Sequence, residues 1–313
     1  MTQSPQYIQL QVPHEHNATR LDKLLAILLP EHSRNQIQKW IKDAHVCIDE
    51  EICQKPKTQV YTGDTIAIDV PEAKTITDQP EDIALNIVFE DEDLLILNKP
   101  SGLVVHPGAG NREGTLLNAL LFYHQPLAQL PRAGIIHRLD KDTSGLMMIA
   151  KSQHAFLTLT EALAQRTIKR HYFAIVSGTI TSEGTVDEPI GRHRFHRQKM
   201  AVTSNGKPAK TSWKVIQRLQ AHSVLHLALH TGRTHQIRVH MQHLGHALLG
   251  DKTYNSNKPM LGLPPTTLTA VRNFPRQALH AYQLHLEHPV SNKPLEIQCE
   301  IPQDIQEIQT LLQ

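Results

Sequence analysis

The segment AGIIHRLDKDTSGLMMIAKS, residues 133–152, places charged side chains between two apolar runs. Asp140 directly follows the apolar-spaced residues 135–139, and a buried carboxylate without partners shifts its pKa or is strongly destabilising. One interpretation is a turn, because residues 142–145 are of types that accept local hydrogen bonds or adopt positive φ. The other is a catalytic carboxylate, since Asp140 precedes the turn proper. This segment alone leaves both interpretations open.

Two further segments combine functional groups with apolar alternation. In TIKRHYFAIVSG, Tyr172 shares a predicted strand face with apolar residues, where a core or interface tyrosine is the simpler alternative. In LHTGRTHQIRVH, Arg233 lies in a predicted strand-to-helix turn, where capping of backbone carbonyls is the simpler alternative. Either segment by itself has an adequate structural explanation.

The stretch from Gly191 to Lys214 carries many basic residues and no acid. Its basic residues are Arg192, Arg194, Arg197, Lys199, Lys207, Lys210 and Lys214, and Phe195 and Trp213 lie among them. A solvated loop is the alternative. Because the whole chain has a formal net charge of only +2, this local concentration favours a surface for nucleic acid.

Metal and cofactor sites lack their usual signatures. The chain has 21 histidines, but in a helix over residues 234–245 His240 and His243 have no carboxylate or cysteine at ligand spacing. GAGNREG, residues 108–114, is one residue too long for a dinucleotide fingerprint. No GxxxxGK is present, and Ser144 lacks a GxSxG context. We therefore expect neither a metal nor a cofactor.

Length and composition predict a globular protein of about two domains. No apolar run is long enough for a membrane span, and the polar N-terminus has no secretory pattern, so we expect a cytoplasmic protein without a membrane partner. Cys47, Cys53 and Cys299 are too few and too irregularly spaced for a zinc site, which favours reduced thiols.

The N-terminal unit is predicted to contain two helices followed by short strands. Helices are expected over residues 19–30 and 33–43, the second with Ser33 as N-cap, and strands over residues 45–51 and 64–70. The second helix is predicted to turn three basic residues outward, namely Arg34, Lys39 and Lys42. The acidic residues 71–84 are interpreted as a linker that would keep away from RNA phosphates, between domains at 18–70 and 85–313.

The C-terminal unit mixes strands and helices without a regular repeat. Strands are expected over residues 94–99, 145–151, 171–178, 223–230, 278–288 and 294–300, and helices over residues 115–124, 152–166, 234–245 and 302–313. Several strands follow one another without helices between them. This order predicts an α+β fold with mixed, largely antiparallel sheets.

Taken together, the segments around Asp140, Tyr172 and Arg233 resemble, in this order, the three signature segments of the RluA-type pseudouridine synthases. The quoted matches are HRLDKDTSGL, KRHYFAIV and TGRTHQIRVH, and NKPSGLVVHPG and RQALHAYQLHLEHP resemble further segments of that family. Residues 18–70 are similar to the alpha-L RNA-binding domain of a ribosomal small-subunit protein. One departure is Asp49-Glu50, which stands where that domain usually has an Asn-Gly turn.

The resemblance implies an RNA pseudouridine synthase with a central cleft and no cofactor. It implies that Asp140 is the essential nucleophile or base and that Tyr172 stacks on an extracted base. Arg233 is then the expected cationic partner of Asp140, and Arg138 is expected to fill the gap left by the flipped nucleotide. The remaining basic residues are expected to contact RNA phosphates, namely Arg34, Lys39, Lys42, Arg192, Arg194, Arg197 and Lys199.

Residues 104–121 and 130–147 are most similar to family members that act on the helix 69 stem-loop of large-subunit (23S) ribosomal RNA. This similarity implies ribosomal RNA or a pre-ribosomal particle as the partner of a monomeric enzyme. Three alternatives remain: a family member acting on other ribosomal or transfer RNA uridines, a catalytically inactive RNA-binding homologue, and an oxidoreductase built on GAGNREG.

Overall fold

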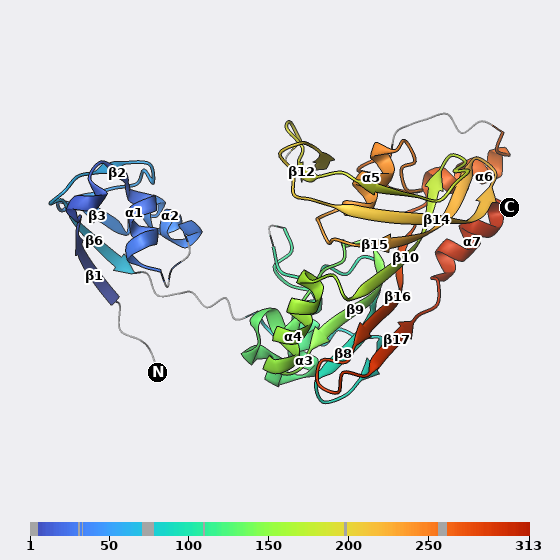
Figure 1. Cartoon of the computed structure of the whole chain (residues 1–313), viewed down its shortest axis with the longest axis horizontal. Coiled ribbons are helices and arrows are strands. Elements are labelled where there is room, and N and C mark those ends of the chain that lie inside the picture. Colours follow the sequence, from blue (N-terminus) through green and yellow to red (C-terminus); the bar gives the residue numbers. More distant parts are fainter. Residues whose placement is uncertain are drawn as a thin grey trace. The chain divides into compact units, whose positions relative to one another are not determined.

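The computed structural model describes residues 6–30, 32, 34–70, 78–108, 110–196, 199–255 and 262–313. The chain forms two compact units, Met1–Thr77 and Asp78–Gln313, and each has a hydrophobic core of its own. Figure 1 labels their helices and strands. No helix in the described ranges combines the length and apolarity needed to cross a bilayer.

The N-terminal unit packs two helices against a small antiparallel sheet. Apolar side chains at helical spacing bury Leu24 of α1, Leu21–Leu28, against Ile37 and Trp40 of α2, Arg34–Lys42. The sheet has the order β1-β6-β3-β4 over the described residues. The remaining elements are β1 Gln6–Gln11, η1 His14–His16, β2 Thr19–Arg20, β3 Val46–Ile48, β4 Glu51–Ile52, β5 Gln59–Val60 and β6 Thr65–Val70. The two predicted helices and the two predicted strands are confirmed, whereas the predicted N-cap Ser33 lies outside the described residues. The strand β1 lies before residue 18 and was not predicted.

Asp49 and Glu50 form the β3–β4 turn without the usual Asn-Gly pair. Their φ angles are 46° and 70°, and positive values at both central residues belong to the turn type that favours Asn-Gly. Asp49 is held by Thr65, whose backbone N donates to Asp49 Oδ1 at 2.8 Å while Asp49 N donates to Thr65 O at 2.8 Å. The hairpin therefore forms, because an adjacent strand supports the first turn residue.

A large, mainly antiparallel sheet organises the C-terminal unit. Its described strands have the order β11-β14-β15-β10-β16-β9-β8-β7, and β17 pairs with β16. The strands are β7 Ile87–Glu90, β8 Leu94–Lys99, β9 Ser144–Ala150, β10 Lys169–Ser177, β11 Gly184–Asp187, β14 Lys210–Leu219, β15 His222–Leu229, β16 Leu279–Glu287 and β17 Pro294–Gln298. The six predicted strands are confirmed. The strands β7, β11 and β14 were not predicted, and neither was the hairpin of β12, Ile190–Arg192, with β13, Met200–Val202.

Helices cover both faces of this sheet. The helices are α3 Leu116–Tyr123, α4 Gln153–Ala164, α5 Gln236–His243, α6 Pro265–Asn273 and α7 Gln303–Leu311, with short 3-10 turns η2 Gln125–Gln129 and η3 Pro131–Gly134. On one face α3 and α5 share a core with Tyr172 of β10, and on the other α6 and α7 pack on Phe173. Four of the helices were predicted, and α6 was not. Adjacent antiparallel strands without helices between them, together with these helices, confirm the α+β class.

The two halves of the sheet meet where β9 pairs in parallel with β16. At this junction Gly145 has a φ of +120°, and a Cβ there would lie 2.2 Å from Ala281 O. Only glycine can take that conformation so close to a neighbouring strand. The junction fixes where residues 140–143 leave the sheet.

Candidate active site

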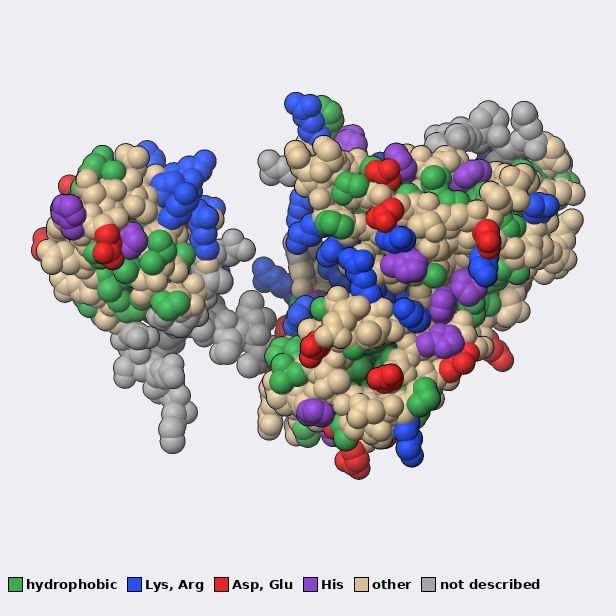
Figure 2. Space-filling model, in the orientation of Figure 1, with side chains coloured by type: hydrophobic (Ala, Val, Ile, Leu, Met, Phe, Trp, Pro, Cys, Tyr) green, Lys and Arg blue, Asp and Glu red, His purple; other side chains and the backbone are tan. Residues whose placement is uncertain are grey.

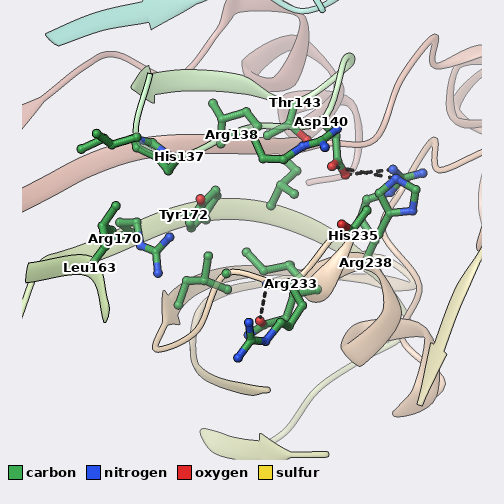
Figure 3. A pocket seen from close by; sticks show the side chains of 18 of the residues that line it. His137, Arg138, Asp140, Thr143, Leu163, Arg170, Tyr172, Arg233, His235 and Arg238 are labelled. Carbon is green, nitrogen blue, oxygen red and sulfur yellow. Dashed lines mark hydrogen bonds and ion pairs between the residues drawn. The ribbon is translucent and has the colours of Figure 1, made fainter. Parts of the chain in front are cut away.

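A cavity of about 410 Å³ opens where the segment before β9, the strand β10 and the start of α5 come together. Asp140, Tyr172 and Arg233, the three residues predicted to be catalytic, all line it (Figure 3). Its described lining contains a single acid, Asp140. It also contains several arginines, which are Arg132, Arg138, Arg170, Arg233 and Arg238.

The turn and the carboxylate of the 133–152 segment are both present in the structure. Thr143 N donates to Asp140 O at 3.1 Å and closes the turn, so the turn interpretation is correct for the residues after Asp140. Leu139 is buried, whereas the Asp140 side chain faces the cavity and is 14 % exposed. The apolar run thus anchors the backbone, and the carboxylate stays accessible.

Lys99 of β8 fixes the turn that carries Asp140. Its side chain is fully buried, and Nζ donates to the carbonyl oxygens of Pro100, Leu103 and Lys141 at 2.8–2.9 Å. Burial lowers the pKa of Lys99 to about 7, against the opposing pull of Asp142 and Asp140. Lys99 therefore ties two loops together beside the cavity.

Arg238, not Arg233, is the cationic partner of Asp140. Arg238 Nη1 donates to Asp140 Oδ2 at 2.9 Å, and Figure 3 shows this contact as a dashed line. Its other nitrogens grip the buried Asp251, with Nε to Oδ2 at 2.7 Å and Nη2 to Oδ1 at 3.0 Å. Burial disfavours the charged guanidinium, but Asp251 and Asp140 outweigh it and raise the pKa of Arg238 further. Arg238 is held in a fixed geometry against Asp140.

The expected pairing of Arg233 with Asp140 is therefore wrong. Arg233 Nε donates to Pro208 O at 3.1 Å, and Arg233 N donates to Gln236 Oε1 at 3.0 Å. Arg233 precedes α5, whereas Arg238 lies in the first turns of that helix and faces the cavity. The sequence signal for Arg238 was a basic side chain on a helix face that is otherwise buried. A buried charge needs a partner of opposite charge, which here would be a carboxylate.

Tyr172 lies on the cavity side of β10 beside Arg170. It is 5 % exposed, and burial raises the pKa of its phenol above the ordinary value, so the hydroxyl stays protonated at neutral pH. His137 plays a structural part nearby: burial lowers its pKa to about 3, and Nε2 accepts a hydrogen bond from Met148 N at 3.0 Å. Tyr172 thus presents an aromatic side chain in a cavity rich in positive charge.

The predicted RNA-contact residues lie in two places. Arg34, Lys39 and Lys42 are exposed on α2, as predicted, although Arg34 Nη2 also donates to Asp22 Oδ2 at 2.7 Å. Arg138 is exposed at the rim of the cavity. In Figure 2, Lys and Arg side chains gather in the middle of the visible face of the C-terminal unit.

The basic stretch is partly a surface hairpin and partly a sheet strand. Arg192 and Arg194 are exposed on or beside β12, Arg194 lies 5.4 Å from the centre of the exposed Phe195 ring, and Lys199 is half-buried. Arg197 lies outside the described residues. Trp213 is not a free aromatic surface, because it packs against the main core and donates Nε1 to Ser182 O at 3.1 Å.

The histidines make no metal centre in the part of the chain that the structure describes. His240 lies in the core, where its ring nitrogens are 2.9 Å from Thr211 Oγ1 and 3.0 Å from Glu188 O. His235 instead lines the cavity, with Nε2 at 3.9 Å from Asp140 Oδ1. His235 and Lys99 were both missed as site residues, because neither position stands out without the fold.

Comparisons with known proteins show the family of each unit. The model of the RNA pseudouridylate synthase family matches residues 93–243, and the S4 domain model matches residues 19–66. Ribosomal large subunit pseudouridine synthase D of Escherichia coli (strain K12) is 49% identical over 290 residues, which cover 92% of this chain and 89% of that protein. The protein of the same name from Haemophilus ducreyi is also 49% identical over 290 residues, with the same coverage of both chains.

Solved structures show the same catalytic fold. Human RNA Pseudouridylate Synthase Domain Containing 4 has a TM-score of 0.56 and 28% sequence identity, covering 72% of this chain and 92% of that one. Human RNA Pseudouridylate Synthase Domain Containing 1 has a TM-score of 0.54 and 27% identity, covering 69% and 83%. Because the sequence identity to the bacterial proteins extends over nearly the whole of both chains, this chain belongs to the RluA-type family of RNA pseudouridine synthases and carries an N-terminal S4 domain.

Proposed function

We propose that this enzyme isomerises uridines of large-subunit (23S) ribosomal RNA, in the helix 69 stem-loop, with Asp140 as the essential carboxylate. One observation carries the proposal: Asp140 is the only acid in the described lining of a cavity that contains five arginines. Such a cavity attracts a phosphodiester backbone and offers one group able to act as nucleophile or base. The similarity to the large-subunit enzymes of bacteria supports the choice of RNA. The enzyme would act as a monomer on the RNA or a pre-ribosomal particle in the cytoplasm.

The proposed reaction changes the uracil ring atom that is bonded to the ribose, from N1 to C5. The N1–C1′ glycosidic bond breaks, the uracil turns over, a C5–C1′ bond forms, C5 loses a proton and N1 gains one. Atoms and electrons balance without an oxidant. Asp140 serves as nucleophile or base in this sequence, and Arg238 supplies its fixed counter-charge through the 2.9 Å contact.

A uridine within a stem-loop has to leave its stack to reach Asp140. The cavity has the size of a small-molecule site, and unstacking costs a few kcal/mol that new contacts must offset. Tyr172 would stack on the extracted base and help to move the C5 proton, and Arg138 at the rim would fill the gap in the RNA. Arg170 and Arg233 would contact the flanking phosphates.

The experiment uses a synthetic helix 69 stem-loop and a matched transfer RNA stem-loop, each incubated with the purified full-length enzyme. Pseudouridines are mapped in both RNAs, and the uridines that become modified are then replaced one at a time by cytidine. The proposal predicts modification of the helix 69 RNA and none of the transfer RNA. Modification of the transfer RNA alone would contradict the proposal. If neither stem-loop is modified, the enzyme is incubated with ribosomal RNA isolated from cells that lack it, and absence of modification there would also contradict the proposal.

A further inference from the structure

A chain of polar contacts leads from the basic hairpin to Asp140. Met200 at the start of β13 donates its backbone N–H to the hydroxyl of Tyr254 at 2.8 Å. The same hydroxyl lies 2.8 Å from Nδ1 of His235, and His235 Nε2 lies 3.9 Å from Asp140 Oδ1. Tyr254 is 8 % exposed and packs in a small core with Ile190 under the hairpin.

The contacts of the Tyr254 hydroxyl favour one tautomer of the neutral His235 ring. The hydroxyl accepts from Met200 N, so its own proton has one available acceptor among these contacts, His235 Nδ1. A neutral imidazole that accepts at Nδ1 carries its proton on Nε2. The opposite tautomer would direct a lone pair from Nε2 at the Asp140 carboxylate, which is repulsive.

The backbone of His235 is also unusual for its position. His235 precedes α5 at the N-cap with a φ of 56°, and its side chain makes no capping hydrogen bond. N-cap positions favour short side chains that cap the helix, and left-handed conformations of larger residues cost free energy. The helix start therefore does not account for a histidine here, whereas its contacts with Tyr254 and Asp140 do.

The charges around His235 agree with a neutral donor. Burial lowers the pKa of His235 below its ordinary value, Asp140 and Asp251 oppose that shift, and Arg238 and Arg138 add to it. The Arg238 guanidinium lies over the Tyr254 ring at 5.1 Å, so Tyr254 contacts both groups that face Asp140. Arg238 binds Asp140 Oδ2 and leaves Oδ1 on the side of His235.

We propose that His235 is a positioning residue: Tyr254 holds it in the Nε2–H form, and His235 donates that proton in a hydrogen bond to Asp140 Oδ1 when RNA closes the 3.9 Å gap. The two carboxylate oxygens of Asp140 are then fixed separately, one by Arg238 and the other by His235. The inference rests on the proposed function, because it assigns His235 a part in the reaction of Asp140.

Three variants separate this role from a merely structural one. His235→Asn suits the left-handed backbone and leaves an acceptor for Tyr254, but its amide is too short to reach Asp140. His235→Gln places an amide N–H near the position of Nε2 and should restore the donor. Tyr254→Phe keeps the ring under Arg238 and removes only the hydroxyl. His243→Asn, an exposed residue on the same helix, is the matched control.

The kinetic readout is the single-turnover rate of pseudouridine formation, measured beside RNA affinity. His235→Asn and Tyr254→Phe should each lower the rate roughly 10- to 100-fold with affinity unchanged within about threefold. The double variant should be no slower than the slower single variant, because both changes remove the same hydrogen bond. His235→Gln should recover most of the rate. Wild-type rates in His235→Asn and Tyr254→Phe, or full additivity of the two changes, would overturn the proposal.

The second readout is independent of activity. Two-bond proton–nitrogen NMR correlations distinguish the two imidazole tautomers, and the His235 signals are those missing from His235→Asn. The wild type should show the Nε2–H form, and Tyr254→Phe should shift it toward Nδ1–H. An Nδ1–H form in the wild type overturns the inference even if the enzyme is active. If the wild type modifies no RNA, the proposed function fails, and the NMR measurement still decides whether Tyr254 holds His235 in the Nε2–H form.

Discussion

Asp22 of the N-terminal unit and Asp140 of the C-terminal unit both contact arginine, but they differ in how far their carboxylates are enclosed. In the N-terminal unit Asp22 is fully buried and accepts hydrogen bonds from Arg20, Arg34 and Gln38, all at 2.6–3.2 Å. In the C-terminal unit Asp140 accepts from one side chain, Arg238, and faces a cavity.

The difference between these sites separates a structural carboxylate from a reactive one. Burial alone would raise the pKa of Asp22, but the hydrogen bonds from Arg20, Arg34 and Gln38 outweigh it and lower the pKa to about 2. The Asp22 side chain is fully buried, so a substrate cannot reach its carboxylate. At Asp140 the cation is instead held by a second acid, Asp251, so one carboxylate oxygen stays available. An arginine contact alone therefore does not identify a catalytic aspartate.

Among changes to the residues around the two aspartates, the largest effect is expected from Arg238→Lys, which breaks the fixed geometry at Asp140. A lysine ammonium cannot bridge Asp140 and Asp251 as the guanidinium does, so turnover should fall by about 100-fold or more. The measurement is single-turnover pseudouridine formation. Arg218→Lys, whose side chain donates only to backbone carbonyls of residues 180 and 181, is the control and should be near wild type.

A second prediction concerns stability at Asp22. Because the pKa of Asp22 is lowered, its carboxylate stabilises the folded unit above about pH 4, and the effect of about 2 kcal/mol is lost as the pH falls toward 2. Asp22→Asn should therefore destabilise the N-terminal unit more at pH 5 than at pH 2.5. The chain has two tryptophans, so Trp40 fluorescence in a Trp213→Phe background reports denaturant unfolding of this unit. An equal difference in unfolding free energy between Asp22→Asn and its parent at both pH values would contradict a lowered pKa of Asp22.

A smaller effect is expected from Arg233→Lys. Arg233 does not contact Asp140 and binds the carbonyl of Pro208, which a lysine can also do. Turnover at saturating RNA should stay within about tenfold of wild type, with most of the change in RNA affinity. If Arg233→Lys instead matched the loss in Arg238→Lys, the described geometry would not be the reacting one.

The smallest effect is expected from changes that test whether the N-terminal unit binds RNA phosphates. Replacing Lys39 and Lys42 by Gln should weaken binding and flatten the log–log salt dependence of affinity by roughly 0.7 to 0.9 for each lost phosphate contact. Turnover at saturating RNA should stay unchanged, because neither side chain belongs to the cavity. A slope identical to that of the wild type would show that α2 makes no phosphate contact.

Several features were accessible from the sequence because they depend on local pattern. Thr115 and Ser152 begin predicted helices and do cap them, and the alternation in residues 223–230 gave the strand β15. The turn after Asp140 also followed from residue types, and the three signature segments were recognised by their resemblance to the RluA-type family. All three predicted catalytic residues line one cavity.

The remaining features depend on contacts between distant segments. The second half of β14 alternates the exposed residues Lys214, Ile216 and Arg218 with half-buried ones. Its place in the sheet depends on pairing with β15, so the sequence alone indicated a basic loop. The partner of Asp140 is set by α5, 98 residues away, and by Asp251 behind it. Local pattern favoured Arg233 over Arg238. Both arginines line the cavity, and the position of α5 decides which of them reaches Asp140.

The central claim is that Asp140 takes part in the reaction, whereas Asp22 stabilises the N-terminal unit. The rate of pseudouridine formation by Asp140→Asn tests this claim most directly. The variant is compared with Asp22→Asn in single-turnover pseudouridine formation on the same RNA, with rates normalised to folded protein. We predict a loss of at least about 1000-fold for Asp140→Asn with RNA affinity and unfolding midpoint unchanged, and a near wild-type rate for Asp22→Asn. A rate for Asp140→Asn within about tenfold of wild type would contradict the account.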